Sequence, residues 1–285
     1  MAENNSWDHT VDVLVIGSGG GGMLTSIRAH DLGADALVIE KTDKFGGTTA
    51  MSGGVVWIPN NDQMAAVNIP DSEEDGFKYL NNLIKGAVPE ERIMAYVKNG
   101  KEMVKYVNEK THLTFTALDA YPDYYTEIQG YKSGARSMDP GEFDGKLLGE
   151  EFYNLRPQHP QTLIFGRLTM TTMEFKAVFQ QTKGWVWLFL KTAIKYMLDI
   201  QQRIREKRSR RLTLGNSVAG ALRRSMMDRN IPLWRNTAFK EFVLEDGAVV
   251  GVVVQKDGKP FRIRAKKGVV CAAGGFEKNQ TMRDK

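Results

Sequence analysis

Six small residues near the N-terminus give the strongest indication of a binding site in the sequence. Gly17, Gly19 and Gly22 satisfy the G-x-G-x-x-G spacing, and the full run is Gly17-Ser18-Gly19-Gly20-Gly21-Gly22. In such a loop the first glycine permits a tight turn, the second lets the backbone approach a pyrophosphate, and the third lets a helix pack closely on a strand. The amides that open the helix also offer hydrogen bonds and a positive dipole end to phosphate groups.

The elements around this loop are those that a dinucleotide site needs. Residues 11–16 form a β-branched apolar run typical of a strand buried on both faces, residues 23–32 predict a helix, and residues 36–39 predict a second buried strand. Glu40 closes that strand, where its carboxylate can accept hydrogen bonds from ribose hydroxyls. The sequence therefore predicts a dinucleotide site, and a flexible glycine turn without a ligand is the alternative.

The stretch after Glu40 indicates which dinucleotide is bound. An NAD(H) dehydrogenase usually continues with regular alternation of strands and helices. Residues 41–54 are instead rich in glycine, hydroxyl side chains and accessible amides. These residue types suit a cofactor that continues past the pyrophosphate into a ribityl chain and an isoalloxazine ring. A plain glycine- and serine-rich loop is the alternative.

The pattern of the C-terminal quarter of the sequence predicts further strands of the same sheet. We expect one strand over residues 232–239, followed by short strands joined by Asp-Gly turns at 246–247 and 257–258, which is the pattern of an antiparallel meander. A final buried strand is expected over residues 268–273, with Cys271 as a small core residue. The end of such a strand is a ligand crevice in an α/β sheet.

Residues 61–213 separate the two parts of this sheet and are predicted to be mainly helical. Helical spacing covers residues 71–87 and 90–110, and the second helix has Pro89 at its first position. Residues 184–211 form a further helical stretch in which an aromatic-apolar patch is followed by a basic cluster. Such a helix can lie on an anionic membrane, whereas a packed helix with a solvated basic end is the alternative.

The run Tyr121-Pro122-Asp123-Tyr124-Tyr125 is the most informative part of this insertion. A tyrosine hydroxyl has a pKa near ~10, so it acts as a base only when its environment or a hydrogen-bonded partner activates it. An aromatic loop packed on the core is the alternative interpretation.

Composition narrows the class of protein further. The chain has 285 residues and a mild net charge of +5, with acids spread among the bases, and no nucleic-acid-binding module is evident. Its single cysteine fits a reducing cytoplasm, and four histidines with one cysteine do not supply a His/Cys metal cage. The first ten residues lack the apolar run of a signal peptide, and residues 185–190, the longest apolar stretch, are too short to span a bilayer.

Two segments carry a resemblance to a known family. Glu40 and Lys41, followed by GGTTAMSGG and VVWIPNN, are similar to the flavoproteins that include 3-ketosteroid dehydrogenases and fumarate reductases, and S-G-G-x-x-W-x-P-N-N resembles the 3-ketosteroid Δ1-dehydrogenases in particular. The resemblance implies FAD, with residues 17–22 on the pyrophosphate and Glu40 on the adenosine ribose. It implies a path to the flavin lined by Lys41, Thr48, Thr49, Ala50, Ser52, Gly53 and Gly54. Ala238 would contact the adenine end, and Ala273 and Gly274 the pyrophosphate.

The same resemblance implies a reaction. In the ketosteroid dehydrogenases a P-D-Y segment supplies a catalytic tyrosine, which corresponds to Tyr124, with Tyr121 and Tyr125 as substitutes. A tyrosinate removes a proton from C2 of a 3-ketosteroid while C1 delivers hydride to flavin N5, and an unidentified acceptor then takes the electrons. The alternatives are a fumarate- or urocanate-reductase-like flavoprotein, a 3-ketosteroid 4-dehydrogenase, and a non-catalytic FAD-binding fragment.

The expected fold class is α/β. We expect a Rossmann-like FAD-binding domain, with a parallel sheet and an antiparallel meander, formed by residues 1–60 and 214–285 and interrupted by the mainly helical insertion 61–213. The resemblance covers nearly all of this chain but about the first half of such an enzyme. The C-terminal substrate domain is therefore expected to be absent, and the chain is expected to be inactive alone.

Overall fold

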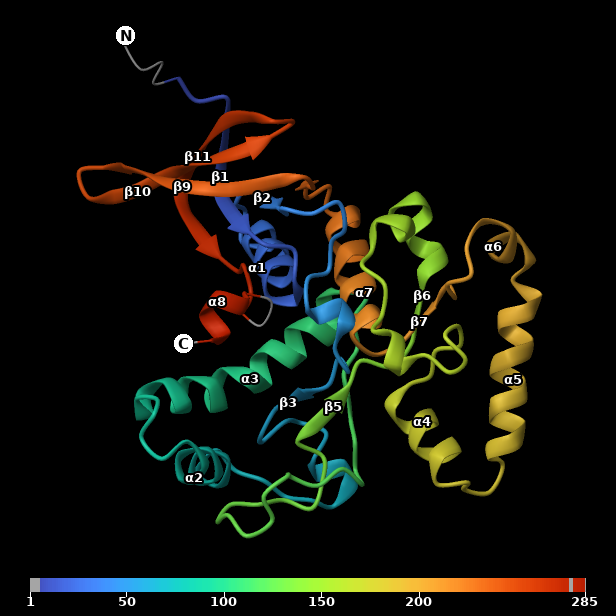
Figure 1. The fold of residues 1–285 in the computed structure, drawn as a ribbon. Coiled ribbons are helices and arrows are strands. Elements are labelled where there is room, and N and C mark those ends of the chain that lie inside the picture. Colours follow the sequence, from blue (N-terminus) through green and yellow to red (C-terminus); the bar gives the residue numbers. More distant parts are fainter. Residues whose placement is uncertain (1–5, 277–278, 285) are drawn as a thin grey trace. The chain divides into compact units, whose positions relative to one another are not determined.

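The computed structural model describes residues 6–276 and 279–284, which belong to two compact units (Figure 1). The first unit consists of Met1–Ser52, Asp144–Thr162 and Val218–Lys285, and the second of Gly53–Phe143 and Leu163–Ser217. Each unit has its own buried apolar residues.

A six-stranded sheet forms the centre of the first unit. Its order is β8-β2-β1-β11-β10-β9, with bounds β1 (His9–Ile16), β2 (Ala36–Ile39), β8 (Leu233–Trp234), β9 (Thr237–Glu245), β10 (Ala248–Lys256) and β11 (Lys259–Cys271). β1 pairs in parallel with β2 and β11, and β2 pairs in parallel with β8. β10 runs antiparallel to both of its neighbours. The expected combination of a parallel sheet with an antiparallel meander is therefore confirmed.

The helix α1 (Gly20–Asp31) connects β1 to β2, as Figure 1 shows. It begins three residues earlier than the apolar spacing predicts, because the glycines themselves form its first turn. Leu14, Ile27 and Leu37 are fully buried, so the helix and the two strands share one core. α7 (Leu214–Asp228) passes from the second unit into the first, where Ala219, Leu222 and Met226 are buried. Short elements complete this unit: η1 (Thr49–Met51), η3 (Gly145–Asn154), η4 (Pro160–Thr162) and α8 (Gln280–Arg283).

Both Asp-Gly turns of the meander are confirmed. Asp246 and Gly247 have φ of 49° and 78°, and Asp257 and Gly258 have 50° and 76°, which are the paired left-handed conformations of a tight hairpin turn. The single strand expected over residues 232–239 is wrong, since Asn236 adopts φ 52° and divides it into β8 and β9.

The last strand also differs from the sequence prediction. β11 is continuous over thirteen residues, and a bulge between the pairs Val11–Ala265 and Val13–Gly268 bends it from the meander toward β1. The predicted burial is wrong at its end, where Val270 is 36% exposed and Cys271 is exposed. Here β11 pairs only with β1, because β10 pairs with residues 259–264, and no layer of the described residues covers this part of the sheet.

Two helices and a small sheet form one part of the second unit. α2 (Glu73–Ile84) packs against α3 (Glu90–Lys110), and the sheet has the order β3-β5-β4. Pro89 occupies the N-cap of α3 rather than its first helical position. The expected helices are otherwise confirmed, and α3 buries Ile93, Val97, Val104 and Val107 at helical spacing. The remaining elements are η2 (Ala65–Val67), β3 (Val56–Trp57), β4 (Thr116–Ala117), β5 (Ser137–Asp139) and β6 (Phe143–Asp144).

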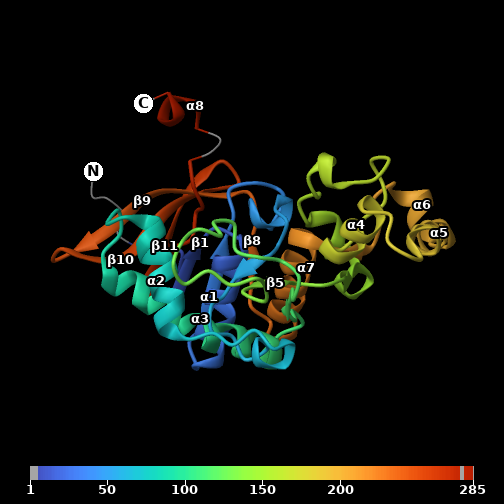
Figure 2. The same ribbon diagram turned by 90° about the horizontal axis from the view of Figure 1, so that it is seen from below.

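The rest of the second unit contains α4 (Thr172–Phe179), α5 (Trp185–Leu198), α6 (Ile200–Arg205) and β7 (Arg211–Leu212), and the three helices lie together in Figures 1 and 2. The helical stretch expected over residues 184–211 is interrupted, because Asp199 leaves helical geometry with φ −80° and ψ 59°. Among the described residues, no helix has both the length and the apolarity that crossing a membrane requires.

Candidate functional site

The glycine loop has the geometry that the G-x-G-x-x-G spacing predicts. Gly17 has φ 106°, and a Cβ there would lie 2.4 Å from the Ala272 carbonyl oxygen. A Cβ on Gly22 would lie 2.0 Å from the Gly17 carbonyl oxygen. Both positions therefore require glycine because other backbone already fills the space, which is the close strand–helix packing expected of the motif.

Gly19 differs from these two glycines. It is the N-cap of α1 with φ −69°, and a Cβ there would meet nothing nearer than Thr49 Oγ1 at 3.6 Å. The protein itself therefore does not require glycine at this position. Open space above the N-cap is what a pyrophosphate needs, because the phosphate oxygens must approach the backbone closely.

The start of α1 is also electrostatically prepared for an anion. The first turn contains no acidic residue, so the positive end of the helix dipole is not compensated by the chain. The Gly20 amide donates to Thr49 Oγ1 at 3.0 Å. The amides of Gly21 and Gly22 belong to the first turn, where helix geometry provides no partner within the helix.

Glu40 lies at the end of β2 and is 8% exposed. One carboxylate oxygen accepts hydrogen bonds from the Ser18 hydroxyl at 2.6 Å and the Ser18 amide at 3.3 Å. The other oxygen accepts from the Thr42 amide and the Thr42 hydroxyl, both at 3.0 Å. These partners hold the carboxylate in place at the edge of the glycine loop.

The Thr42 hydroxyl leaves room for a ribose hydroxyl on Glu40. It lies 2.8 Å from the Lys44 carbonyl oxygen as well as 3.0 Å from the Glu40 carboxylate. A hydroxyl carries one proton and can donate to one acceptor at a time. When Thr42 donates to Lys44, one site on the Glu40 carboxylate is open to another donor.

The loop after Glu40 lies against the glycine loop. The Gly46 amide donates to the Ser18 carbonyl at 3.1 Å, and a Cβ on Gly47 would lie 3.2 Å from the Gly19 Cα. Lys41, Thr48 and Ser52 are exposed, whereas Ala50 is fully buried and packs beneath the loop.

Three other predicted residues of the first unit come to the same edge of the sheet. Ala238 follows Thr237, whose amide donates to the Glu40 carbonyl at 2.8 Å. Ala273 and Gly274 follow Ala272, whose amide donates to the Ile16 carbonyl at 2.8 Å beside Gly17. Gly53, Gly54 and Tyr124 belong to the second unit. There Gly54, with φ 73°, packs against the backbone of Leu214.

These residues fit the adenosine and diphosphate parts of FAD. Gly19 leaves an open cradle at a helix N-terminus, and Glu40 provides a fixed carboxylate for sugar hydroxyls. A Cβ placed on Gly21 would meet none of the described residues within 4 Å, and one on Gly19 would meet only Thr49 Oγ1 at 3.6 Å.

The second unit contains a buried cluster of charges. Arg136 is fully buried and forms a bidentate ion pair with Asp71, with both N–O distances at 2.7 Å. Its third bond, at 2.8 Å, goes to Asp123, whose side chain is 2% exposed. The guanidinium also lies over the Trp57 ring at 5.2 Å and the Tyr79 ring at 5.6 Å. Five side chains far apart in the sequence are thereby held in one place.

This cluster joins the two segments that carry the family resemblance. The Trp57 indole nitrogen donates to Asp123 at 2.6 Å, so W-x-P-N-N and P-D-Y are directly bonded. Asn60 adopts the left-handed conformation, and its amide donates to Asp71 at 2.8 Å. The Asn61 side chain donates to the Ile58 and Ala135 carbonyls, both at 2.9 Å. The W-x-P-N-N motif therefore positions residues 121–125, which we call the tyrosine loop.

Tyr124 follows Asp123 and is 80% exposed. Its hydroxyl lies 3.1 Å from the Tyr121 hydroxyl. This hydrogen bond, together with partial burial, raises the pKa of Tyr121 above its usual range. Either hydroxyl can donate in this pair, and the raised pKa favours the protonated form of Tyr121. The Tyr125 ring is 47% exposed, and its amide donates to the Tyr79 hydroxyl at 3.2 Å.

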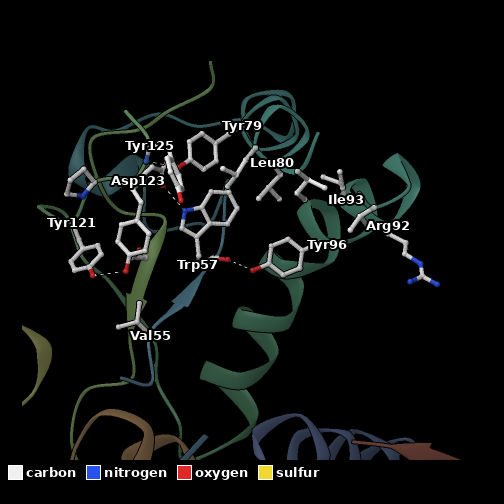
Figure 3. A pocket seen from close by; sticks show the side chains of 16 residues that line it. Val55, Trp57, Tyr79, Leu80, Arg92, Ile93, Tyr96, Tyr121, Asp123 and Tyr125 are labelled. Carbon is white, nitrogen blue, oxygen red and sulfur yellow. Dashed lines mark hydrogen bonds between the residues drawn. The ribbon is translucent and has the colours of Figure 1, made fainter. Parts of the chain in front are cut away.

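A cavity of about 540 Å³ lies beside these tyrosines (Figure 3). Trp57, Tyr79 and Tyr125 gather on one side of it, Tyr96 contacts the Trp57 carbonyl, and the Arg92 guanidinium points away. The cavity is lined mainly by aromatic and aliphatic side chains, which is typical of a site for a small apolar ligand.

Sequence reasoning missed several of the residues that organise these sites. Thr42 lies two residues after Glu40, and a hydroxyl so close in sequence to a carboxylate was the available signal. Asp71 and Arg136 carry no local pattern that marks them as partners, since 65 residues separate them. Arg136 does occur in the G-A-R-S-M-D-P segment, which resembles a segment of the ketosteroid dehydrogenases, and that resemblance was the usable signal.

Comparisons with known proteins agree with this geometry. The profile of the FAD binding domain family matches residues 12–285. A crystal structure of 3-ketosteroid Δ1-dehydrogenase from Sterolibacterium denitrificans, in complex with 1,4-androstadiene-3,17-dione, is 44% identical, with a TM-score of 0.91 over 97% of this chain and 50% of that one.

Two curated relatives match with similar coverage. The 3-oxosteroid 1-dehydrogenase of Comamonas testosteroni is 35% identical over 96% of this chain and 48% of its own length. The 4-oxocyclohex-2-ene-1-carboxylate 5-dehydrogenase of Sinomonas cyclohexanicum is 30% identical over 96% of this chain and 46% of its own length. The chain thus spans about half the length of these relatives. The family profile matches nearly the whole chain, including the glycine loop and Glu40, and this protein therefore belongs to the FAD-binding domain family.

Proposed function

We propose that this chain supplies the FAD-binding part of a 3-ketosteroid Δ1-dehydrogenase-like oxidoreductase. The proposed FAD site is supported by a contrast within the glycine loop. Gly17 and Gly22 are enclosed by backbone, whereas Gly19 faces open space. The observation that favours the steroid class is the 44% identity to a 3-ketosteroid Δ1-dehydrogenase over almost the entire chain.

The residues of the first unit bind and orient the cofactor. The amides that open α1 hold the diphosphate, and Glu40 accepts a hydrogen bond from the adenosine ribose once Thr42 donates to Lys44. Ala238 lies at the adenine end and Ala273 and Gly274 at the diphosphate. Bound FAD supplies the acceptor for a hydride from the substrate.

Tyr124 is proposed as the base that removes the C2 proton of a 3-ketosteroid. The 3-keto group makes this proton acidic, because the negative charge that forms is shared with the carbonyl oxygen. Tyr121 acts as the donor to the Tyr124 oxygen, and its raised pKa keeps it protonated for that task. Hydride leaves from C1 in the same overall reaction, so the substrate loses two hydrogens and gains a C1–C2 double bond.

The FAD site is tested by Gly19→Ala. A methyl group at this open position should weaken FAD binding at least tenfold and leave the stability of the chain without FAD unchanged. Gly21→Ala is the matched control, because a Cβ there meets nothing within 4 Å and the motif accepts any residue at that position. Fluorescence titration with FAD measures both, and equal affinity of the two variants would refute the proposed diphosphate site.

The dehydrogenase activity is tested with the longest form of the chain that its gene encodes. We expect FAD-dependent conversion of 4-androstene-3,17-dione to the 1,4-diene in the presence of an artificial acceptor dye, and loss of turnover in Tyr124→Phe with FAD binding retained. Reduction of fumarate, or oxidation of 4-oxocyclohexanecarboxylate in place of the steroid, would contradict the steroid assignment while leaving the FAD site intact.

We also propose that the protein works in the cytoplasm, where Cys271, which is a free thiol in the structure, would remain reduced. Its natural electron acceptor is then a cytoplasmic or membrane-bound carrier. Fractionation of producing cells, with dehydrogenase activity as the readout, checks the location.

A further inference from the structure

Tyr124 is exposed, but the two ends of the segment that carries it are bonded to each other. The Asp123 amide donates to the Lys132 carbonyl at 3.1 Å, and the Lys132 amide donates to the Asp123 carboxylate at 3.0 Å. Further hydrogen bonds between backbone groups of residues 125–131 fold the interior of the segment. Residues 124–131 therefore form a compact loop whose ends lie side by side.

The far end of loop 124–131 lies directly on α2. Gly130 has φ 88°, and a Cβ there would lie 2.4 Å from the Asp75 carbonyl oxygen and 3.0 Å from the Tyr79 amide nitrogen. A side chain does not fit between two backbones at this separation. Glycine at position 130 therefore allows the loop to contact the helix.

Two side chains of α2 hold the same loop at other points. The Asp75 carboxylate lies 2.8 Å from the Lys132 ammonium nitrogen. The Tyr79 hydroxyl accepts a hydrogen bond from the Tyr125 amide at 3.2 Å, and Figure 3 shows the two tyrosines next to each other. Asp75 and Tyr79 are four residues apart and thus face the same side of the helix. One side of α2 therefore contacts the loop near its start, near its end and just beyond it.

The ring of Tyr79 is itself fixed by its neighbours. It is buried and stacks on Trp57 with 5.7 Å between ring centroids. The Arg136 guanidinium lies 5.6 Å from the Tyr79 ring centroid. The buried charge cluster thus fixes Asp123 at the start of the loop, and α2 fixes the remainder.

The helix that holds the loop also lines the cavity beside it. Leu80, Leu83 and Ile84 of α2 line the cavity of about 540 Å³, and Tyr124 lines it as well. Because one helix contributes to both, the position of Tyr124 relative to a ligand in the cavity depends on the contacts between α2 and the loop.

We propose that α2 positions Tyr124 for proton abstraction, and that Gly130 and Tyr79 are the positioning residues. Both act through the backbone of the loop that carries Tyr124. The ring of Tyr124 is 80% exposed, so packing around this side chain does not hold it, and the loop backbone must do so. The inference rests on the proposed role of Tyr124 as the base.

Gly130→Ala tests the contact between the loop and α2. In the longest form of the chain we expect kcat for 4-androstene-3,17-dione to fall about a hundredfold, because a small displacement of a reacting group is enough for such a loss. KM should change by less than about threefold, since the cavity side chains of α2 are unchanged. FAD affinity should be retained.

Gly86→Ala is the matched control. Gly86 has φ 81°, close to that of Gly130, but a Cβ there meets nothing within 4 Å. The two variants therefore share the backbone strain and differ in the contact with α2. Gly86→Ala should leave kcat and KM unchanged, and circular dichroism checks that both variants are folded.

A second readout needs neither FAD nor substrate. The hydrogen bond with Tyr124 is the main reason that the pKa of Tyr121 is raised. Carbon-13 NMR of the tyrosine-labelled chain, followed as a function of pH, should show this pKa falling toward its usual value of ~10 in Gly130→Ala. Tyr124→Phe should lower the pKa of Tyr121 in the same direction, whereas Gly86→Ala should leave it unchanged.

Tyr79→Phe tests the other positioning residue and serves as a substitute where Gly130→Ala does not fold. It keeps the ring that stacks on Trp57 and removes the acceptor of the Tyr125 amide, which should lower kcat about fivefold. Tyr131→Phe is the control, because it removes a hydroxyl from the loop and leaves this hydrogen bond in place.

Three results would overturn the proposal: an unchanged pKa of Tyr121 in folded Gly130→Ala, an equal kcat in Gly130→Ala and Gly86→Ala, or an unchanged kcat in Tyr79→Phe. Failure of the unsubstituted longest form to act on the steroid would instead contradict the proposed function. The NMR titration would still decide whether α2 positions Tyr124.

Discussion

The glycine loop of the first unit and the tyrosine loop of the second are held in place by different means. Backbone shape fixes the glycine loop, since Gly17 and Gly22 lie against other backbone with no space for a side chain. Side-chain charge fixes the tyrosine loop, since the buried Arg136 holds Asp71 and Asp123. The first means depends on backbone packing, in which Gly22 meets the nearby Gly17 and Gly17 meets the distant Ala272. The second depends on the charges of side chains far apart in the sequence.

This difference predicts different sensitivities to mutation. Adding a methyl group should be the most damaging small change in the glycine loop, whereas removing a charge should be the most damaging one in the tyrosine loop. The comparison would be contradicted if removing a charge were the more damaging change in the glycine loop, or if adding a methyl group were the more damaging change in the tyrosine loop.

The largest effect is expected for Arg136→Met. The substitution removes the guanidinium that pairs with both buried carboxylates, Asp71 and Asp123, which costs about 3–5 kcal/mol of unfolding free energy. Urea unfolding measures the loss. Arg92→Met is the control, because Arg92 is exposed and points away from the cavity, and it should change stability by less than about 0.5 kcal/mol.

A variant in which all three charged side chains of the cluster are replaced by uncharged ones sharpens this test. The triple variant Arg136→Met/Asp71→Asn/Asp123→Asn removes the unpaired charges and should recover part of the stability. If Arg136→Met alone were as stable as the control, the buried ion pairs would not be what holds the tyrosine loop.

Gly22→Ala should have the next largest effect. Its new Cβ would lie 2.0 Å from the Gly17 carbonyl oxygen, so backbone must move, at a cost of about 3 kcal/mol. Gly21→Ala places the same methyl group one residue earlier in open space and should be neutral or slightly stabilising. Thermal unfolding of the two variants side by side gives the difference, and equal melting temperatures would contradict the packing argument.

Glu40→Gln should weaken FAD binding about tenfold, because a neutral amide replaces the charged acceptor of a hydrogen bond. Thr42→Val removes the hydroxyl that shares the Glu40 carboxylate, and it should leave FAD affinity unchanged or increase it. Isothermal titration with FAD measures both variants. A large loss of affinity in Thr42→Val would show that its hydroxyl contacts the cofactor directly.

The smallest effect is a pH dependence of stability. The pKa values of Tyr79, Tyr96 and Tyr121 are raised, the first two mainly by burial and the third mainly by the hydrogen bond with Tyr124. A raised pKa in the folded state stabilises the fold below the unfolded-state pKa of ~10, and this contribution is lost as the pH rises through the folded-state pKa. Unfolding free energy should therefore fall above about pH 10. The fall should be smaller in Tyr121→Phe and unchanged in the control Tyr131→Phe.

The first unit could be predicted largely from the sequence because its signals are local. Glycine spacing, two buried strands and two Asp-Gly turns each specify structure within a few residues, and the sheet confirms them. The errors arose where the structure depends on the backbone conformation of a single residue, which the pattern of apolar and polar residues does not reveal. Nothing in the apolar pattern of residues 232–239 shows that Asn236 would turn the chain into a second strand.

The tyrosine loop could be located but not explained from the sequence. Its P-D-Y segment was noticed through a resemblance, yet the hydrogen bond from Trp57 to Asp123 spans 66 residues. Such a pairing depends on how α2, α3 and the small sheet pack, which periodicity does not describe. The exposure of Trp187 was equally out of reach, since apolar content indicates that a helix needs cover but not whether the chain provides it.

The continuous course of β11 has a mechanical consequence. Residues 259–264 pair with β10 and residues 263–271 pair with β1, so a single strand belongs to both the hairpins and the parallel layer. Separation of the hairpins from the sheet would pull on the same backbone that continues into Ala272 beside Gly17. Amide hydrogens of the meander and of the nucleotide-binding edge should therefore exchange with solvent as one cooperative unit, and ligand at that edge should slow exchange as far away as the hairpin tips.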